Sequence, residues 1–444
     1  MPSKAPSKAD RGGIVAISVC GYKSIRDKHR IELRPLTLLA GANSSGKSSI
    51  MQPLLLLKQT LEAPYDPGPL RLDGPNVRFT SVDQLLSKVR GRACSSEFSV
   101  GLETAGGSSI ELTFSRSAER GFDIRSMAYS NGQKEAGTLF PGMTEEQISL
   151  LPLPALRHFY ETLVRRRQDD MRWDVVRERC FLRLVLRRAE PGDLVPVLPS
   201  RYLAQLDRAI MGVIHLPGLR GNPARAYGTT AVGEYFLGEF HNYLASIVTQ
   251  WQARDQKLLD SLAGALENLG LTWRIKARPV DDTQVELEVG RLPHKQRGGA
   301  GDLVNIADVG FGVSQVLPVL VALLVARPGQ VVYLEQPELH LHPRAQKGLA
   351  LALAEAARRG VTVVAETHSA LLLLGVQTLV AQGALPPDLV KLHWFHRRPK
   401  DGVTEVQSAD LDDRGRFGEK WPEDFDDVLL QAEREYLDAV EAPR

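Results

Sequence analysis

The feature that most constrains this chain of 444 residues is a glycine-rich segment near its start, residues 41–48, which reads GANSSGKS. A short apolar run, residues 36–40, precedes the segment, and the apolar spacing of Ile50, Leu54 and Leu57 predicts a helix after it. A strand, a loop with the pattern G-x-x-x-x-G-K-[ST] and a helix together form a phosphate-binding loop. The sequence therefore predicts an ATP-binding α/β domain.

The residue types in this loop match the chemistry of nucleotide phosphates. Gly41 and Gly46 allow the backbone to curl so that its N–H groups point at phosphate oxygens, and the N-terminus of the following helix attracts the same negative charge. Lys47 is expected to reach the β- and γ-phosphates, and the hydroxyl of Ser48 is expected to bind Mg²⁺. The predicted nucleotide contacts of the loop are Asn43, Ser44, Gly46, Lys47, Ser48 and Ser49.

A second strong pattern is an apolar strand that ends in carboxylates, residues 330–343, which read QVVYLEQPELHLHP. Because α/β sheets place their ligand sites at the carboxyl ends of strands, Glu335 and Glu338 are expected to face the nucleotide. One carboxylate can hold the Mg²⁺ shell and another can orient or activate the attacking water. His340 and His342 stand two apart with no evident third ligand nearby in the sequence, so a structural role is favoured over a metal pair.

Two further segments extend the pattern. Residues 361–369, which read VTVVAETHS, predict a strand followed by His368, a candidate for sensing the γ-phosphate or polarising the water. Residues 308–315, which read DVGFGVSQ, open an apolar helix with two glycines and a serine, and such a helix start can bind an anion. Taken alone, that segment is better explained as an ordinary helix N-cap.

The order of these four segments resembles the ATP-binding-cassette class of ATPases. It is closest to the soluble branch that includes SMC-like, recombination-repair and overcoming-lysogenization-defect ATPases. The residues within the motifs resemble bacterial AAA-type ATPases of that branch more closely still. Such proteins read G-x-N-x-S-G-K-S, G-x-G-x-S-Q, E-x-P-E-x-H-L-H-P and E-T-H-S, and all four are present here. The resemblance implies an α/β fold, an ABC-type P-loop ATPase with a mixed central sheet, an antiparallel β lobe and a helical insertion.

The resemblance also implies how the site is completed. In that class two protomers pack head to tail, so the expected assembly is a homodimer or a higher even oligomer. Gly312, Ser314 and Gln315 are then expected to contact the γ-phosphate of the ATP that the partner chain binds. Glu335 matches the Mg²⁺-side acid and His368 the switch histidine. Gln84 is the candidate for the glutamine that usually follows the helix of the first lobe.

One position departs from the class. Two consecutive acids usually end the acidic strand, whereas this chain has Glu335 followed by Gln336. The usual general-base position therefore carries an amide, and Glu338 is the candidate to replace it. Because removing a base typically lowers a rate by ~10²–10⁴-fold, the sequence predicts a slow ATPase.

Changes in composition and pattern suggest five segments. Residues 1–13 are polar and are expected to form a disordered tail. Residues 14–143 form the expected N-terminal ATPase lobe, in which the Gly106-Gly107 pair predicts a β-hairpin. Residues 144–210 are rich in Leu, Arg and Glu and predict a helical insertion, with helical spacing at Leu156, Phe159 and Leu163. Residues 211–384 form the expected C-terminal ATPase lobe, and residues 385–444 resemble a small tail domain of uncharacterised function.

Composition excludes some classes of protein. The formal net charge of +2 gives no argument for or against nucleic acid. The cysteines Cys20, Cys94 and Cys180 are widely spaced, which favours a reduced, cytoplasmic protein. The longest apolar stretches fall short of the ~20 residues that a membrane span needs.

These observations favour an ATPase switch in a bacterial defence system, whose closure controls a separate effector such as a nuclease or toxin. The alternative is a DNA repair or recombination ATPase that clamps DNA through a basic groove. An intrinsic TOPRIM nuclease is disfavoured because few residues remain after the ATPase, although Asp410 and Asp412 resemble a metal-binding pair. The motif wording also argues against the ATPase subunit of a membrane transporter. The arginines available for DNA are Arg165, Arg166, Arg167, Arg187 and Arg188, for which a solvated helix face is the simpler explanation.

Overall fold

The computed structural model describes residues 13–91, 93–119, 121–132, 136–151, 171–188, 195–198, 200–294 and 302–418. Its central sheet has the strand order β11-β16-β17-β3-β18-β19, in which β19 alone of these strands runs antiparallel to its neighbour. Apolar residues dominate the parallel strands because both faces of the sheet are covered. The bounds are β11 Ile214–Leu216, β16 Val331–Glu335, β17 Thr362–Thr367, β3 Leu36–Gly41, β18 Val390–Arg397 and β19 Thr404–Ala409.

The first face of the central sheet packs against α1, Lys47–Leu61, and an antiparallel sheet. Side chains alternate between the two faces, so that Leu39 lies in this core while Leu38 lies in the opposite one. The antiparallel sheet contains the hairpin predicted at the Gly106-Gly107 pair, formed by β4 and β5. Its order is β2 His29–Glu32, β1 Ile14–Cys20, β4 Glu97–Thr104, β5 Ser109–Arg116, β6 Phe122–Ser130 and β7 Ala136–Leu139.

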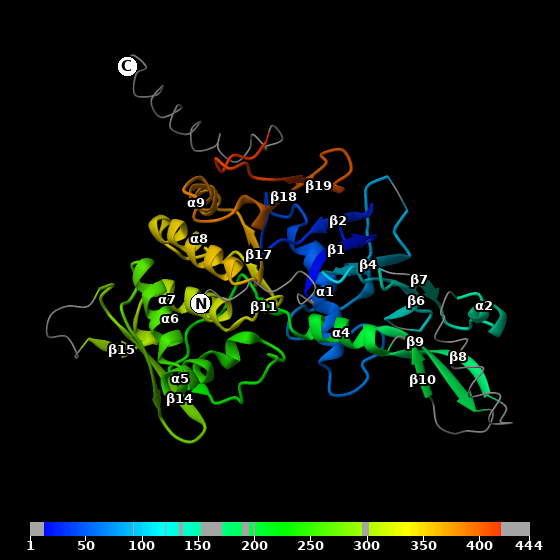
Figure 1. Ribbon diagram of the computed structural model, residues 1–444, viewed down its shortest axis with the longest axis horizontal. Helices are drawn as coiled ribbons and strands as arrows, with labels where there is room; N and C mark the ends of the chain where they lie inside the picture. The colour runs from blue at the N-terminus through cyan, green and yellow to red at the C-terminus, as the bar shows by residue number, and fades with distance from the viewer. Residues whose placement is uncertain are drawn as a thin grey trace, which may run out of the picture.

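Helices cover the second face of the central sheet, and a small sheet packs outside them (Figure 1). The helices are α5 Leu244–Arg254, α6 Gln256–Asn268, α7 Phe311–Val325, α8 Pro343–Arg358 and α9 Ala370–Ala381. The small sheet contains β12 Tyr227–Gly228, β13 Ile275–Pro279, β14 Gln284–Gly290 and β15 Leu303–Asn305. Short 3₁₀ turns occur at η2 Val82–Gln84, η3 Phe240–Tyr243, η4 Ile306–Asp308 and η5 Pro387–Leu389. The predicted α/β class, with a mixed central sheet and an antiparallel β lobe, is thus confirmed.

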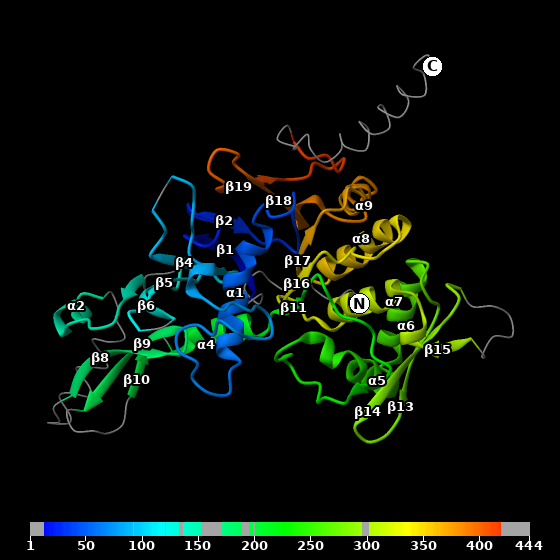
Figure 2. The ribbon, with the colours of Figure 1, turned by 180° about the vertical axis from the view of Figure 1, so that it is seen from behind.

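The predicted helical character of residues 144–210 is wrong for much of what the structure describes there. An antiparallel sheet of β8, β9 and β10 lies at the opposite end of the molecule from β15 (Figure 2). Composition misled the prediction: leucine, arginine and glutamate suit helices, but Arg172, Trp173, Asp174 and Val175 alternate with the period of a strand. The elements are α2 Glu145–Ser149, β8 Met171–Glu178, β9 Phe181–Arg188, β10 Val195–Leu198 and α4 Ser200–Met211.

The helical spacing predicted at Leu156, Phe159 and Leu163 lies outside the described residues, as do the predicted tail at residues 1–12 and residues 419–444 of the C-terminal segment. The segment boundaries remain predictions. Among the helices that the structure describes, none has the length and apolar character that crossing a membrane requires.

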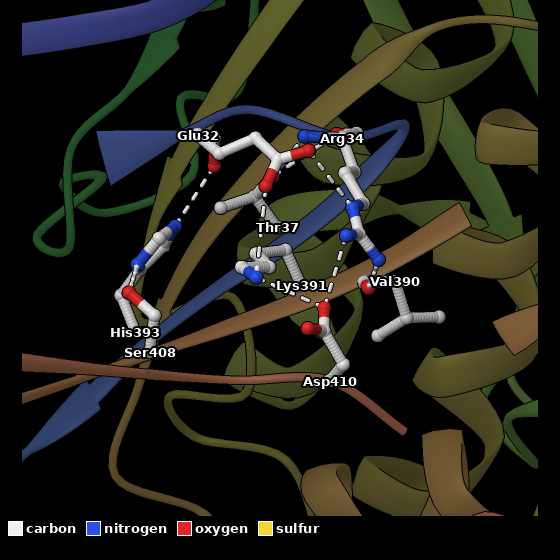
Figure 3. A network of polar contacts seen from close by, with 8 residues as sticks. All are labelled: Glu32, Arg34, Thr37, Val390, Lys391, His393, Ser408 and Asp410. Carbon is white, nitrogen blue, oxygen red and sulfur yellow. Dashed lines mark hydrogen bonds and ion pairs between the residues drawn. The ribbon is translucent and has the colours of Figure 1, made fainter. Parts of the chain in front are cut away.

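A polar network fastens the central sheet to the antiparallel sheet at the edge opposite the phosphate loop (Figure 3). Lys391 on β18 donates to Asp410 at 2.9 Å, and Arg34 pairs with the same carboxylate at 3.0 Å. His393 is buried and lies 2.8 Å from both the Ser408 hydroxyl and the Glu32 backbone oxygen. Since a carbonyl only accepts, Nε2 of His393 carries the proton, and Nδ1 accepts from Ser408 in the neutral ring.

We expect His393 to make the fold less stable in acid. Burial lowers the pKa of His393 to about 4, and the positive charges of Lys391 and Arg34 lower it further. The hydrogen bond to the Glu32 backbone and the negative charge of Glu32 act in the opposite direction. As the pH falls, the unfolded chain, with a histidine pKa of ~6.5, binds a proton before the folded chain does. The contribution of neutral His393 to the free energy of unfolding is therefore complete above pH ~6.5 and is lost as the pH falls toward 4. The loss is at most about 3 kcal/mol.

Chemical denaturation at pH 7.5 and pH 5 measures this effect. The fall in the free energy of unfolding should be smaller for His393→Gln than for the natural chain. His294→Gln is the matched control, because that side chain is exposed. An equal fall in His393→Gln and the natural chain would contradict the assignment.

Candidate functional site

The sheet topology brings the predicted motifs to one edge. The phosphate loop follows β3, the acidic residues follow β16 and His368 follows β17, and all three strands are parallel. The loop after β11 reaches the same edge, because β11 is also parallel to β16. These carboxyl ends form the candidate nucleotide site, as the sequence predicted for an α/β sheet.

The phosphate loop depends on its two glycines. Gly41 has φ 140° and Gly46 has φ 106°, in the range that favours glycine. Space also demands them: a Cβ on Gly41 would lie 2.1 Å from the Phe395 oxygen, and one on Gly46 would lie 2.5 Å from Thr404 Oγ1. Thr404 in turn donates to the Ser45 backbone oxygen at 2.7 Å, so β19 supports the loop from behind.

The outer residues of the loop, Asn43 and Ser44, are exposed, whereas Lys47 and Ser49 are buried. Lys47 Nζ donates to the backbone oxygens of Gly41 at 2.9 Å and Ala42 at 2.8 Å, so its ammonium group lies within the loop. Burial lowers the pKa of Lys47 to about 8, against the opposing charges of Glu366 and Glu338. The lysine is therefore positioned for the anion that the loop is predicted to bind.

Ser48 meets an acid that the sequence analysis did not select. Its hydroxyl donates to Glu366 Oε2 at 2.8 Å, and the Tyr333 hydroxyl donates to the other oxygen of that carboxylate. Glu366 is only 3% exposed. Burial, with Glu335 adding its charge, raises the pKa of Glu366 to about 7. The available signal was an acid at the end of an otherwise apolar strand, two residues before His368.

Glu335, the predicted Mg²⁺-side acid, lies beside Glu366 as its register partner on the neighbouring strand. It accepts from His215 Nε2 at 3.1 Å and from the Gly218 backbone N–H at 3.3 Å. Burial is the largest single effect and raises the pKa of Glu335. The hydrogen bond and charge of His215, together with the hydrogen bonds from Gly218 and Tyr333, more than offset it and hold that pKa below its ordinary value. His215 was a further residue that the sequence analysis missed.

Glu338 links the acidic segment to the histidine strand. Its Oε1 accepts from the Thr367 hydroxyl at 2.7 Å and from the His368 backbone N–H at 3.0 Å. His368 is half-buried, and burial together with nearby Lys47 lowers the pKa of its ring. The structure thus brings Glu338, His368 and Lys47 near one another, while Gln336 adopts a left-handed backbone with φ 44° between the two acids.

The Gly-Ser-Gln segment begins α7, and its polar side chains are engaged within the chain. Ser314 Oγ donates to the Phe311 backbone oxygen at 3.0 Å, and Gln315 Nε2 donates to the Gly221 backbone oxygen at 2.8 Å. Gly312 is half-buried, but Phe311 beside it is 53% exposed. The structure places this segment at a helix start, and its predicted contact with a second chain's nucleotide stays a prediction.

Arg220, in the loop after β11, connects that helix to the acidic strand and was missed by the sequence analysis. Its guanidinium donates to the backbone oxygens of Gln315 at 3.1 Å and Glu335 at 2.9 Å. Burial lowers the pKa of Arg220 to about 10, against the opposing charges of Glu338 and Glu335. The start of α7 and the end of β16 are therefore linked through one charged side chain.

The residues at this edge fit a nucleotide with Mg²⁺. In the part of the chain that the structure describes, Ser45 Oγ and Glu338 Oε2 are buried without a hydrogen-bond partner, and such atoms are usually satisfied by water or a ligand. Mg²⁺ takes one or two protein oxygens beside phosphate and water. A group of three or more potential metal-ligating side chains is therefore not required, and the described residues contain none.

Several other candidates have local partners. His342 Nδ1 accepts from the Arg344 backbone N–H at 3.3 Å and caps α8, and the His340 ring lies 6.3 Å from that of Phe311. Gln84 bonds to nearby Thr80. Asp412 accepts from the backbone of Arg414 and Arg416.

Most of the arginines considered for DNA fall outside the described part of the chain. Arg165, Arg166 and Arg167 lie outside the described residues, as does the side chain of Arg188. Arg187 pairs with Asp174 at 3.4 Å.

Comparison with known proteins gives two matching family models. The model described as "AAA domain, putative AbiEii toxin, Type IV TA system" matches residues 151–374, half of the chain, and that described as "AAA ATPase domain" matches residues 13–99. Between them the two matches contain all four motifs. No curated protein matches the chain.

Solved structures similar to the chain include three SMC heads. An SMC head bound to the C-terminal winged-helix domain of ScpA has 13% identity and a TM-score of 0.47, over 90% of this chain and 98% of that one. The SMC head domain from Thermotoga maritima has 11% identity and a TM-score of 0.39, over 89% of this chain and 98% of that one. An SMC head with an extended coiled coil, bound to the C-terminal domain of ScpA derived from Pyrococcus furiosus, has 12% identity and a TM-score of 0.43. The match covers 97% of this chain and 100% of that one.

Proposed function

Since the chain belongs to the AAA ATPase family described as "AAA domain, putative AbiEii toxin, Type IV TA system", we propose that it is a slow ATP-driven switch. It binds ATP with Mg²⁺, closes head to tail as a homodimer and hydrolyses the nucleotide to reopen. Closure controls a separate effector, such as a nuclease or toxin, in the cytoplasmic defence of a bacterium against phage. The toxin–antitoxin wording of the family supports the defence role.

The observation that carries the switch proposal is Gln336 in its structural setting. The edge of the sheet holds a lysine, a hydroxyl and several carboxylates around one loop, which suits tight binding of a magnesium nucleotide. The position directly after Glu335 carries an amide, which cannot accept a proton as a carboxylate does. Such a site favours long-lived binding over rapid turnover.

Two features of α7 support closure between two chains. The exposed Phe311 ring stands at the helix start beside Gly310 and Gly312, where a second chain can approach the backbone N–H groups. Arg220 couples this helix to Glu335, so the approach of a second chain would reach the acidic strand of the first. Lys47 and the loop N–H groups would hold the ATP phosphates, Ser48 would help to hold Mg²⁺, and that ion would neutralise charge on the phosphates.

Replacing Ser314 by arginine tests the proposal. The natural chain is expected to shift from monomer to dimer when ATP is added, because α7 then meets the partner's nucleotide. Ser314→Arg should bind ATP with unchanged affinity but stay monomeric, since its bulk blocks that approach while its own phosphate loop is intact. Light scattering after size-exclusion chromatography measures the mass, and fluorescent-nucleotide titration measures the affinity.

Ser261→Arg is the control, because Ser261 is also a helical serine whose hydroxyl donates to a backbone oxygen in the preceding turn, but it lies on α6. The effector should co-purify in an ATP-dependent manner with the natural chain and with this control, but not with Ser314→Arg. A Ser314→Arg chain that dimerises normally with ATP would refute head-to-tail closure through α7.

A further inference from the structure

We propose that Glu366 is the carboxylate that acts together with Ser48 on the magnesium ion of the bound nucleotide. The inference deepens the proposed function and rests on it. It assigns to Glu366 the role that the sequence pattern gave to Glu335.

The contacts of Glu366 support this role. Ser48, in the first turn of α1, donates to Glu366 Oε2 at 2.8 Å, although the two residues are 318 positions apart in the chain. The Tyr333 hydroxyl holds the other oxygen, so the carboxylate is fixed with one oxygen directed at the phosphate-loop helix. A side chain oriented in this way is a preorganised ligand, because little conformational freedom is lost when a cation binds.

Glu335 has a different orientation. His215 and the Gly218 backbone N–H occupy its two oxygens, and both groups lie on the β11 side of the sheet. Glu335 and Glu366 are register partners on adjacent parallel strands and therefore stand side by side at the same edge. Of these two neighbouring acids, Glu366 is the one that contacts the serine of the loop.

The electrostatics of the pair also favour a cation. A buried carboxylate is costly unless it is paired with opposite charge, and Glu366 is buried beside a second carboxylate. Its hydrogen-bond donors, Ser48 and Tyr333, are neutral, and the positive charge of nearby Lys47 only partly offsets the effect of burial. Mg²⁺ prefers oxygen ligands and accepts a hydroxyl and a carboxylate alongside phosphate and water.

The experiment is equilibrium binding of a non-hydrolysable ATP analogue in EDTA and in increasing Mg²⁺. Glu366→Gln keeps the shape of the side chain but removes its charge. We expect it to reduce the Mg²⁺-dependent gain in affinity by about tenfold or more, as loss of a metal-site group typically does. Its affinity in EDTA should be unchanged or higher, because a negative charge near the phosphates is gone. Glu335→Gln should lose less of the gain, and Glu355→Gln on the exposed face of α8 should lose none.

The outcomes separate the two proposals. If the natural chain fails to bind the analogue at all, the proposed function is wrong. If it binds with a clear Mg²⁺-dependent gain and Glu366→Gln retains that full gain, the assignment of Glu366 is wrong, and a purely structural link between Tyr333 and Ser48 remains. Glu366→Asp is the second variant in case the first does not fold. Its shorter side chain should also reduce the gain, and an unchanged gain would again overturn the proposal.

Discussion

Replacing Lys47 with alanine is expected to lower the affinity for ATP by about 100-fold or more. The ammonium group lies within the phosphate loop, 2.9 Å from the Gly41 oxygen and 2.8 Å from the Ala42 oxygen. A charged hydrogen bond contributes roughly 1.5–3 kcal/mol, and the loss of about 2.7 kcal/mol corresponds to a hundredfold change in affinity. The variant also lacks the one side-chain cation that the loop itself provides.

Isothermal titration calorimetry with the non-hydrolysable analogue measures this loss. Lys28→Ala serves as the control, because Lys28 is an exposed lysine that pairs with Glu111 of the antiparallel sheet at 2.7 Å. The control should bind as the natural chain does. Nucleotide affinity in Lys47→Ala within a few-fold of the natural value would mean that the loop does not hold the phosphates.

Replacing Glu338 with glutamine is expected to reduce ATP turnover by ~10²–10⁴-fold, the range for loss of a general base. Nucleotide binding should persist, so an ATP-bound dimer should accumulate. The fold should tolerate the change: the amide oxygen can still accept from Thr367 and His368, as Oε1 does now. The new NH₂ group replaces Oε2, a buried atom with no partner among the described residues.

Phosphate release under saturating ATP measures turnover, and light scattering detects the trapped dimer. Gln336→Glu is the informative companion variant, because it restores an acid at the usual position. If that position can act as the base, turnover should rise above the natural rate. Turnover at the natural rate in Glu338→Gln would show that Glu338 is not the base.

Much of the fold could be predicted because apolar strands and helices have recognisable periods. The strands at residues 36–41 and 331–335 and the helix at residues 47–61 lie where the pattern indicated. The main error, between residues 144 and 210, came from weighing composition above the two-residue alternation of Arg172 to Val175. Residues suited to helices form a strand there because the alternation buries Val175 on one face.

The sequence by itself determined that a phosphate loop, two acids and a histidine each follow an apolar strand, and that Gln336 occupies a position usually held by an acid. Tertiary structure alone decided which side chains touch. Ser48 donates to Glu366, His215 donates to Glu335, and Arg220 joins Gln315 to the acidic strand. These contacts depend on which strands are neighbours and how they are aligned, because a shift of one residue moves a side chain to the opposite face of the sheet. The phosphate loop could therefore be recognised from one short segment of sequence. The carboxylate beside its Ser48, that of Glu366, could not, because it lies on a strand more than 300 residues away in the chain.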